Sequence, residues 1–268
     1  MKKIIISLAP VAASTSIDAD LLAADVAKSV LLGAGMCHLH CRKEDGTLTP
    51  DTSFLITCFE KILAKTDVVI QASTGGVSDL TIEQRCAPLT YTKVESASLN
   101  GGSTNLGEAI YHNSFSDIRY CAQAVYDHQI IPEIEVFDIG MIHNIELTAG
   151  EQPFRNPIIY NLVFGHKGGM QPTIEGLTAF RSFVPKDALW GVTHFGRDNW
   201  DFLAAAIAMG DSIVRIGFED SPYVNASHMA THNYEVVDKL ANLIRAMDFE
   251  TATPEEAREI MHICPTLF

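Results

Sequence analysis

The feature that most constrains the fold of this chain is a series of short apolar runs, rich in β-branched residues, that recurs from one end to the other. Each run has the length of a β-strand, and continuous apolar character is typical of strands buried on both faces. The eight runs are Lys3–Ala9, Met36–Cys41, Val68–Ala72, Lys93–Leu99, Ile131–Phe137, Ile158–Phe164, Leu189–His194 and Ser212–Phe218.

Segments with a helical period of apolar residues separate these runs. They include Ile17–Leu32, Thr52–Ala64, Asp117–His128, Thr173–Phe183, Trp200–Met209 and, last, Val236–Ala246. Strict alternation of strand and helix predicts a parallel sheet. Eight units favour a closed barrel over a doubly wound sheet, since the turn after the first run, Leu8-Ala9-Pro10-Val11, lacks the glycines of a dinucleotide-binding turn. We therefore predict an α/β fold, a single (β/α)8 TIM barrel in which residues 1–268 form one domain.

The charge of the chain narrows its possible partners. It contains 33 acidic and 19 basic residues, for a net charge of -14. A field of this sign repels phosphate backbones and anionic lipid, so we predict no nucleic-acid partner and no membrane partner. An anionic small-molecule substrate would require local positive charge, either from a metal or from a side chain such as Lys167 or Arg197.

The cysteines and the N-terminus bear on location. The six cysteines are scattered and form no C-x-x-C pair, which favours a reducing cytoplasm. The segment Met1-Lys2-Lys3 followed by the apolar residues 4–13 resembles a short secretory leader. The same residues are needed as the first strand, so we favour the strand and predict a cytoplasmic location.

A candidate metal site combines the ends of two strands. His38 and His40 end the second run, and residues two apart on a strand project from the same face and can reach one ion. Alone, such a pair can equally consist of packed structural histidines. Glu219 follows the eighth run, which in a barrel lies beside the first strand and near the second. Two histidines and one carboxylate leave an open coordination position, as in catalytic zinc sites, so we predict a divalent metal here, with zinc favoured.

Four further charged residues lie near strand ends. Glu133 and Glu135 stand two apart in the fifth run, and an inward carboxylate is unfavourable unless it is paired. We expect at least one of them, Glu135, to belong to the site, although both could face solvent or a helix as a matter of register. Arg215 and Asp220 flank the end of the eighth run and form either a structural ion pair or a charged pair that tunes proton transfer beside the metal.

Two loops combine hydroxyl or amide side chains with glycine. Glycine lets backbone N–H groups approach a ligand, so such loops can cradle a carboxylate, although they are equally typical of plain turns. The loops are Ser73-Thr74-Gly75-Gly76 after the third run and Ser98-Leu99-Asn100-Gly101-Gly102 after the fourth, and the candidate substrate-binding residues in them are Ser73, Thr74, Gly75, Ser98 and Asn100.

In this order the motifs resemble the β-keto acid cleavage enzymes, of which 3-keto-5-aminohexanoate cleavage enzyme is the known type. The segments that carry the resemblance span nearly the whole chain: His38-Leu39-His40, Ser73-Thr74-Gly75-Gly76, Ser98-Leu99-Asn100, Pro132-Glu133-Ile134-Glu135-Val136, Gly168-Gly169-Met170, Phe195-Gly196-Arg197 and Arg215-Ile216-Gly217-Phe218-Glu219-Asp220. The resemblance implies a homotetrameric barrel enzyme. It also implies roles for single residues: zinc ligands at His38, His40 and Glu219, catalytic charges at Arg215, Asp220 and Glu135, and keto-acid binding by Ser73, Ser98 and Asn100.

The implied reaction joins a β-keto acid to acetyl-CoA and cleaves the product in a retro-Claisen step, giving acetoacetate and a new acyl-CoA. A metal with an open position would polarise the keto group and stabilise an enolate. Asp220, held by Arg215, would take the proton next to that group, and Glu135 also qualifies as the base. Two alternatives remain open: a CoA-independent divalent-metal aldolase or hydrolase of small keto acids, and a non-enzymatic barrel whose histidines only pack.

One departure from the family concerns the substrate. The enzyme acting on the amino substrate has a glutamate after the first strand, in a Thr-Gly-Ala-Glu run, where this chain reads Ala9-Pro10-Val11-Ala12-Ala13. A cationic amine would lose its counter-ion there, so we predict a neutral or apolar substrate tail, or one recognised by another loop. Ser98 replaces a threonine of the family and preserves the hydroxyl.

Overall fold

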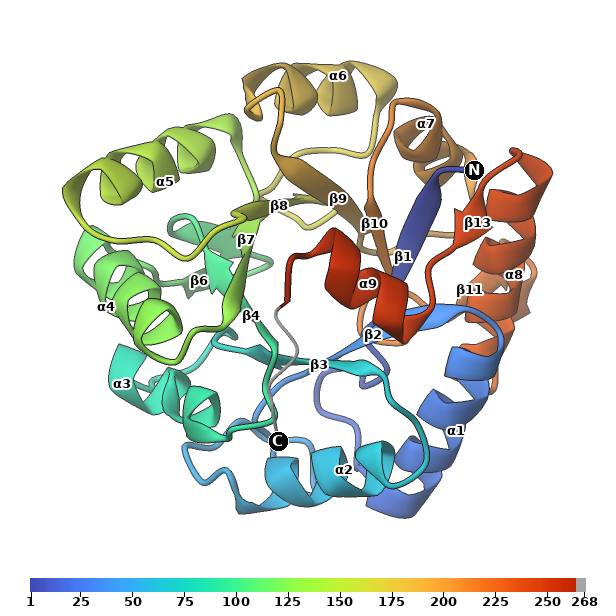
Figure 1. The fold of residues 1–268 in the computed structure, drawn as a ribbon, viewed down its shortest axis with the longest axis horizontal. Helices are drawn as coiled ribbons and strands as arrows, with labels where there is room; N and C mark the ends of the chain where they lie inside the picture. Colours follow the sequence, from blue (N-terminus) through green and yellow to red (C-terminus); the bar gives the residue numbers. More distant parts are fainter. Residues whose placement is uncertain (264–268) are drawn as a thin grey trace.

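The computed structural model describes residues 1–263, and within them eight parallel strands close into a barrel (Figure 1). Each strand pairs with the next, and the last returns to the first through pairs from Ile5–Ile213 to Leu8–Ile216. The predicted barrel is confirmed. Its strands are β1 (Lys3–Leu8), β2 (Ala34–Leu39), β3 (Val69–Ser73), β4 (Ser96–Asn100), β7 (Ile131–Val136), β8 (Ile159–Phe164), β9 (Leu189–His194) and β10 (Ile213–Ile216).

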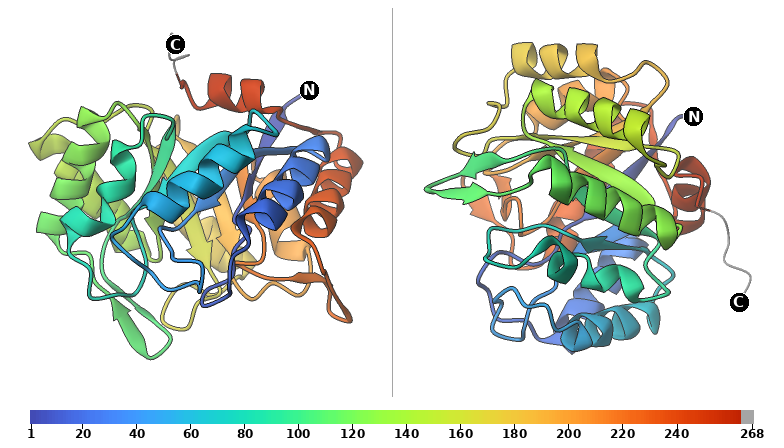
Figure 2. Two further views of the ribbon diagram at one scale, coloured as in Figure 1. Left: turned by 90° about the horizontal axis from the view of Figure 1, so that it is seen from below. Right: turned by 90° about the vertical axis from the view of Figure 1, so that its left-hand side faces the viewer.

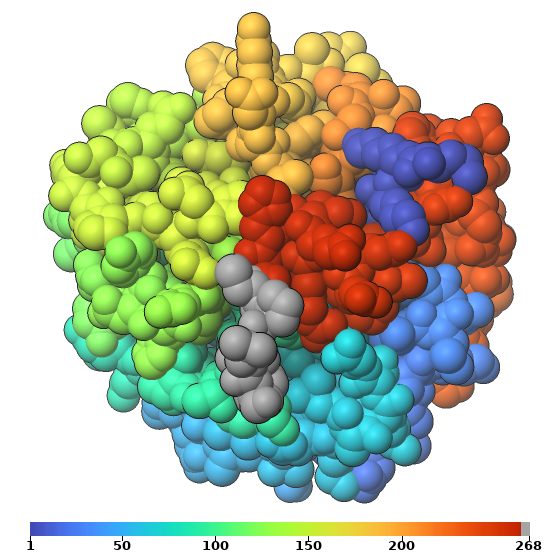
Figure 3. All heavy atoms as spheres, in the orientation of Figure 1, coloured from blue at the N-terminus to red at the C-terminus, as the bar shows by residue number. Residues whose placement is uncertain are grey.

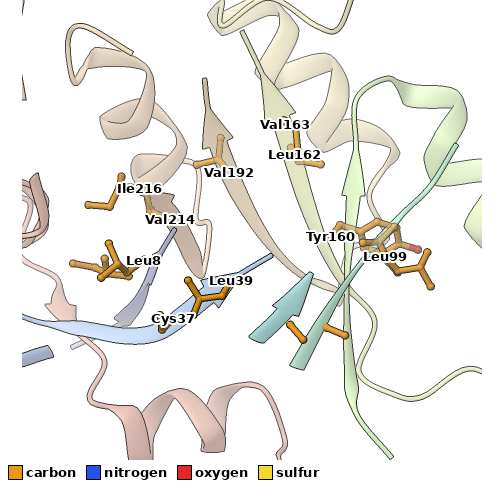
Figure 4. Close-up of a cluster of buried hydrophobic side chains, with 14 of the residues drawn as sticks. Leu8, Cys37, Leu39, Leu99, Tyr160, Leu162, Val163, Val192, Val214 and Ile216 are labelled. Atoms are coloured by element: carbon orange, nitrogen blue, oxygen red, sulfur yellow. The ribbon is translucent and has the colours of Figure 1, made fainter. Parts of the chain in front are cut away.

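Helices surround the barrel (Figure 1). Their apolar faces pack against the outward side chains of the strands. Figure 4 shows part of this core, with Leu8, Leu39 and Leu162 among the strand residues that form it. The helices are α1 (Ala19–Leu31), α2 (Ser53–Leu63), α3 (Ile82–Arg85), α4 (Phe115–Asp127), α5 (Ile139–Glu151), α6 (Ile174–Phe183), α7 (Asp201–Ala208) and α8 (Asn233–Ala246), and a 3-10 turn, η1 (Ala87–Thr90), follows α3.

Several elements lie outside those predicted from the sequence. They are α3, α5, the C-terminal β13 (Glu250–Thr251) and α9 (Pro254–Ile260), and two hairpins, β5 (Thr104–Leu106) with β6 (Ala109–Tyr111) and β11 (Tyr223–Asn225) with β12 (His228–Met229). The hairpins extend from the carboxyl ends of the barrel strands, and α9 lies at the opposite end (Figure 2).

The bottom of the barrel interior is apolar and closed. Inward side chains of six strands form a separate buried cluster with Ala257 and Met261, which α9 and the turn after it contribute. Figure 3 shows α9, in red, lying across the middle of this face. The members of the cluster on the barrel strands are Ile5, Met36, Val69, Ile131, Ile159 and Ile213.

Among the described residues, no helix is long and apolar enough to cross a membrane. The five described cysteines are free and buried, and Cys264 lies outside the described residues.

Candidate active site

Strand alternation decides which side chains enter the barrel. Cys37 and Leu39 of β2 belong to the outer core, so His38, between them, points inward. The same holds in β7, where Ile134 and Val136 face the helices, and Glu133 and Glu135 are therefore both buried inside the barrel. The register in which both glutamates face solvent or a helix is thereby ruled out.

The turn after β10 carries Glu219 into the site. Gly217 has a φ of +139°, and a Cβ there would lie 2.1 Å from the carbonyl oxygen of Ala9, so only glycine fits. The N–H of Glu219 then donates to the same carbonyl, while Asp220 and Ser221 donate back to the carbonyl of Gly217. This close approach of the chain after β10 to the end of β1 brings Glu219 to the histidines of β2.

His38, His40 and Glu219 form a compact group whose potential ligand atoms all lie within 4.8 Å of one another. Nε2 of His40 is 3.1 Å, and Nε2 of His38 3.9 Å, from Oε1 of Glu219. Three ligands at about 2 Å from one zinc ion have separations of this size. The structure thus brings together the three residues that the sequence analysis selects as a metal site.

Nδ1 of each histidine faces an oxygen atom outside the candidate metal site, so Nε2 is the nitrogen that each ring turns toward Glu219. Nδ1 of His40 lies 3.2 Å from the carbonyl oxygen of Gly75, which can only accept, and Nδ1 of His38 lies 2.6 Å from Oε1 of Gln71. Burial lowers the pKa of His38 to about 3, so this ring is neutral. Its Nε2 is buried without a hydrogen-bond partner in the described part of the chain. Two Nε2 atoms and a carboxylate that converge in this way fit a divalent cation.

Arg215 joins the candidate catalytic carboxylates. Its Nη1 donates to Oε1 of Glu135 at 2.8 Å, and its Nη2 and Nε donate to the two oxygens of Asp220 at 2.7 and 3.1 Å. Nη2 also lies 3.3 Å from Oε1 of Glu219. One guanidinium therefore contacts three carboxylates, two of them buried, which leaves an excess of negative charge that a metal cation would balance.

Burial sets the proton affinities around Arg215. It raises the pKa of Asp220 and the pKa of Glu135 above their ordinary values, and the charge of Arg215 opposes this rise in both. Burial acts in the same sense on Glu219, but His40 and Arg215 outweigh it and hold the pKa of Glu219 below its ordinary value. Carboxylates with raised pKa are better general bases near neutral pH, whereas Glu219 stays a carboxylate suited to a metal.

The candidate substrate-binding residues divide into two groups. The hydroxyls of Ser73 and Ser98 lie 3.3 Å apart inside the barrel, and the buried Nδ2 of Asn100 has no partner among the described residues. The hydroxyl of Thr74 instead donates to the carbonyl oxygen of Ser98 at 2.6 Å and accepts from Cys121 of α4, so it faces the outside of the barrel. Thr74 can therefore offer a ligand only its backbone.

Gly75 serves the histidine side of the site. Its carbonyl oxygen accepts from His40, and a Cβ at this position would lie 2.1 Å from the hydroxyl of Tyr111 on β6. Tyr111 belongs to a hairpin that the sequence analysis does not predict, and it is 3% exposed. The β5–β6 hairpin thus packs directly against the loop that orients a metal ligand.

The two loop cations have different surroundings. Lys167 pairs with the exposed Glu108 at the surface. Arg197 is 2% exposed, its guanidinium lies 3.9 Å from the centre of the Trp200 ring, and both its Nη atoms lack partners in the described chain. Asp138 caps α5 by accepting from the N–H of Gly140, which gives it a structural role.

Sequence reasoning missed a polar layer directly below the site. Gln71, Glu133 and Asn161 are inward, buried residues joined by hydrogen bonds, and Thr193 extends the chain of contacts. Gln71 lies within an otherwise apolar run, and an isolated polar residue of this kind is a signal that could have identified the layer.

Comparison with known proteins identifies the family. The sequence profile described as beta-keto acid cleavage enzyme matches residues 13–263. The chain belongs to this family. Among its relatives, a 3-keto-5-aminohexanoate cleavage enzyme from Fusobacterium nucleatum is 36% identical over 234 residues, which cover 86% of this chain and 84% of the relative.

Other relatives of this β-keto acid cleavage enzyme family member carry names that include acetyl-CoA. A 3,5-dioxohexanoate:acetyl-CoA acetone transferase from Paraburkholderia graminis is 29% identical, covering 86% of this chain and 84% of the relative. A 3-oxoadipate:acetyl-CoA acetyltransferase from Cupriavidus necator is 27% identical, with 85% and 81% covered. The family resemblance seen in the sequence is confirmed, and an enzyme that acts on acetyl-CoA is supported.

Solved structures agree on the fold. The ternary complex of ObcA with C4-CoA adduct and oxalate superposes with a TM-score of 0.79 over 93% of this chain and 67% of that chain. Sequence identity is 15%, so this likeness bears on the barrel alone.

Proposed function

We propose that this protein is a zinc-dependent enzyme that converts a β-keto acid and acetyl-CoA into acetoacetate and a new acyl-CoA. The observation that carries the proposal is the convergence of His38 Nε2, His40 Nε2 and Glu219 beside the Arg215–Asp220 pair. Membership of the family, and relatives whose names include acetyl-CoA, support the reaction class.

The proposed chemistry assigns distinct tasks to the side chains. Zinc bound by His38, His40 and Glu219 would supply a Lewis acid for the keto group. Asp220 takes a proton from the carbon between the keto group and the carboxylate, and its two bonds to Arg215 hold it in position for this transfer. Glu135, bonded to the same arginine, is the alternative base.

The substrate carboxylate needs hydrogen-bond donors, and β3 and β4, which follow β2 around the barrel, offer them. Ser73 and Ser98 offer hydroxyls, and Nδ2 of Asn100 offers an unpartnered buried N–H group. An unpaired buried donor is unfavourable. A substrate oxygen that accepts from Asn100 would therefore raise the affinity for the substrate and fix the orientation of its carboxylate.

The bonds balance in two steps. The deprotonated carbon attacks the acetyl carbonyl, a carbon–carbon bond forms, and CoA leaves as a thiolate. The thiolate then attacks the original keto carbon, and the bond between that carbon and the former nucleophile breaks. The carbanion released by this cleavage takes back the proton that Asp220 holds, so the products are acetoacetate and the acyl-CoA of the remaining substrate.

We propose a substrate tail that carries no positive charge. The loop after β1 reads Ala9-Pro10-Val11-Ala12-Ala13 and carries no acidic side chain. A cationic amine would find no counter-ion in this loop, which disfavours it.

The metal and the reaction class can be tested together. Zinc content is measured for the purified protein, for His38→Ala, and for His143→Ala, an exposed histidine of α5 that serves as a control. Acetoacetate formation is assayed with a panel of β-keto acids, with and without acetyl-CoA. We expect about one zinc per chain and acetyl-CoA-dependent product in the parent and in His143→Ala, with both lost in His38→Ala.

Other outcomes separate the alternatives. Turnover of keto acids with metal but without any need for acetyl-CoA would favour the aldolase or hydrolase. Absence of bound metal in the parent, even after reconstitution with zinc, would contradict the mechanism.

The substrate tail has its own test. We expect an uncharged β-keto acid to surpass an amino-keto acid of equal length in kcat/KM. Val11→Glu, compared with Val11→Gln as the uncharged control, should raise the relative kcat/KM of the amino substrate. A parent that strongly prefers the amino substrate would refute the tail assignment while leaving the reaction class intact.

The homotetramer, the cytoplasmic location and the single domain over residues 1–268 stay predictions. Light scattering of the purified protein tests the first, and the same zinc assay can be run on the assembled species.

A further inference from the structure

The polar layer beneath the metal site is a continuous chain of hydrogen bonds across the barrel. It starts at Nδ1 of His38, 2.6 Å from Oε1 of Gln71, and passes from Nε2 of Gln71 to Oε2 of Glu133 at 3.0 Å. Asn161 donates to the other oxygen of Glu133 at 2.7 Å, and the hydroxyl of Thr193 donates to Asn161 at 2.9 Å. The five residues come from β2, β3, β7, β8 and β9, so the chain crosses more than half of the barrel.

The neighbours of Gln71 fix the direction of its amide. Both N–H groups of Nε2 are engaged, one by Glu133 and one by the hydroxyl of Ser96 at 3.0 Å. Ser96 donates its own proton to the carbonyl oxygen of Ile131, so it must accept from Gln71. Oε1 of Gln71 therefore faces His38, and Nδ1 of His38 must carry the proton. Its lone pair is on Nε2, the atom that points into the metal site.

The neighbours of Glu133 determine its protonation in the same way. Both of its oxygens face amide N–H groups, from Gln71 and from Asn161, and a proton on either oxygen would find a donor instead of an acceptor. Its side chain is 1% exposed, so the charge lies in the interior without an ion-pair partner in direct contact among the described residues. A buried carboxylate held only by neutral amides is unfavourable for folding unless it serves another purpose.

We propose that Glu133 is a positioning residue for the metal: through Gln71 it selects the tautomer of His38 and strengthens Nε2 as a ligand. The inference rests on the proposed metal site and assigns the layer below it. A ligand histidine whose second nitrogen donates to an acceptor is held in orientation and made more basic, and here the acceptor is itself polarised by a carboxylate.

The test measures metal binding, independently of turnover. The dissociation constants of Zn2+ and Co2+ are determined by competition with a chromogenic chelator, and the visible absorption of bound Co2+ reports the ligand set. In Glu133→Gln the NH2 group of the new amide faces an amide donor, so the side-chain amide of either Gln71 or Asn161 must rotate by about 180° to present its oxygen. Either arrangement removes the charge, and we expect Zn2+ affinity to fall about 10- to 100-fold with an unchanged far-UV spectrum.

A swapped pair distinguishes a positioning role from a merely structural one. In Gln71→Glu with Glu133→Gln, the carboxylate at 71 accepts from His38 and from the amide at 133, whose oxygen accepts from Asn161. The swap preserves volume and net charge and keeps an acceptor opposite His38, while Ser96 turns its hydroxyl from Ile131 to the new carboxylate, so affinity should return to within about threefold of the parent. Glu95→Gln is the matched control, because it removes a half-buried carboxylate bonded to Arg258 elsewhere.

Each result bears on the proposal. Loss of affinity in Glu133→Gln with recovery in the swap supports it. Unchanged affinity in Glu133→Gln, an equal loss in Glu95→Gln, or no recovery in a folded swap would overturn it. If Glu133→Gln fails to fold, the affinity of the swap decides. A parent that binds no Zn2+ would contradict the proposed function itself, whereas a parent that binds Zn2+ as tightly as Glu133→Gln does would contradict only this inference.

Discussion

Arg215 illustrates how much of the site depends on the shape of one side chain. Its guanidinium reaches Asp220 through two nitrogens and Glu135 through a third contact, at 6% exposure. A lysine carries the same charge, but it cannot form the two parallel bonds that align a carboxylate.

We predict that Arg215→Lys lowers kcat about 100-fold or more while zinc content stays near that of the parent. Asp220 would lose its fixed orientation, whereas the three metal ligands would remain. Steady-state acetoacetate formation and metal analysis check this, with the exposed Arg119→Lys as the control. Activity within threefold of the parent would mean that the pair is only structural.

A second prediction concerns Asp211, which is fully buried with neither carboxylate oxygen bonded in the described chain. Burial raises its pKa well above the ordinary value, and Lys2 opposes this only in part. The folded state then binds the proton more tightly than the unfolded state, so this residue lowers stability as pH rises above about 4. Asp211→Asn should be about 1–3 kcal/mol more stable than the parent at pH 7.

The measurement is urea unfolding of both proteins between pH 4 and pH 8. The difference should shrink toward pH 4, where the folded parent holds the proton and the unfolded state begins to bind one. A difference that is constant over this range would contradict the assignment to Asp211.

At the residue scale, the sequence predicted side chains that follow from strand periodicity alone. His38, His40 and Glu219 could be predicted because they stand at or just after strand ends. The partners of Gln71 were not, because they depend on register between strands far apart in the chain. The outward orientation of Thr74 likewise depends on a hydrogen bond across β4.

At the element scale, the strands were predictable because parallel, doubly buried strands read as continuous apolar runs. Helix α5 was missed because Gly140, Gly150 and Thr148 weaken its helical pattern. Helix α9 was missed because it is only seven residues long. Its start does carry a recognisable signal, since Thr253 and Glu256 form a capping box and Pro254 stands in the first turn. The short strands of the two hairpins carry too few apolar residues to show a period.

The β5–β6 hairpin should be coupled to the loop after β3. We predict that Gly75→Ala destabilises the protein by about 1–3 kcal/mol, because the new methyl group overlaps the hydroxyl of Tyr111. Tyr111→Phe removes that hydroxyl, so the double variant should recover part of the loss. Urea unfolding of the four proteins forms a double-mutant cycle, and strictly additive effects would exclude the coupling.

Helix α9 should contribute to stability without affecting the metal. Met261 is fully buried in the lower cluster, and Met261→Ala should cost about 2–5 kcal/mol of unfolding free energy. Zinc affinity should remain within about twofold of the parent, because the polar layer separates this cluster from the site. The exposed Met229→Ala is the control, and a parallel loss of zinc affinity in Met261→Ala would contradict the separation.

At the scale of the whole molecule, the barrel interior is graded from an apolar lower layer through a neutral and acidic middle layer to the charged site. Removing a cation from the top should therefore leave the carboxylates around Arg215 in excess. We predict that chelation lowers the unfolding temperature, by an amount that corresponds to about 4 kcal/mol when free zinc exceeds its dissociation constant 1,000-fold. Calorimetry with and without EDTA measures this, and His38→Ala should show no response.

Helix α9 closes the lower end of the barrel, and this affects which substitutions the protein can tolerate during evolution. Packing at the lower end is complete without any contribution from the loops at the carboxyl ends of the strands. Substitutions in those loops can therefore accumulate without destabilising the barrel. Relatives that are 27–36% identical to this chain have names that specify a dioxo acid, an amino-keto acid and a dicarboxylic acid. We expect that exchanging these loops between such relatives transfers substrate preference, and that the loop after β1 has the largest effect.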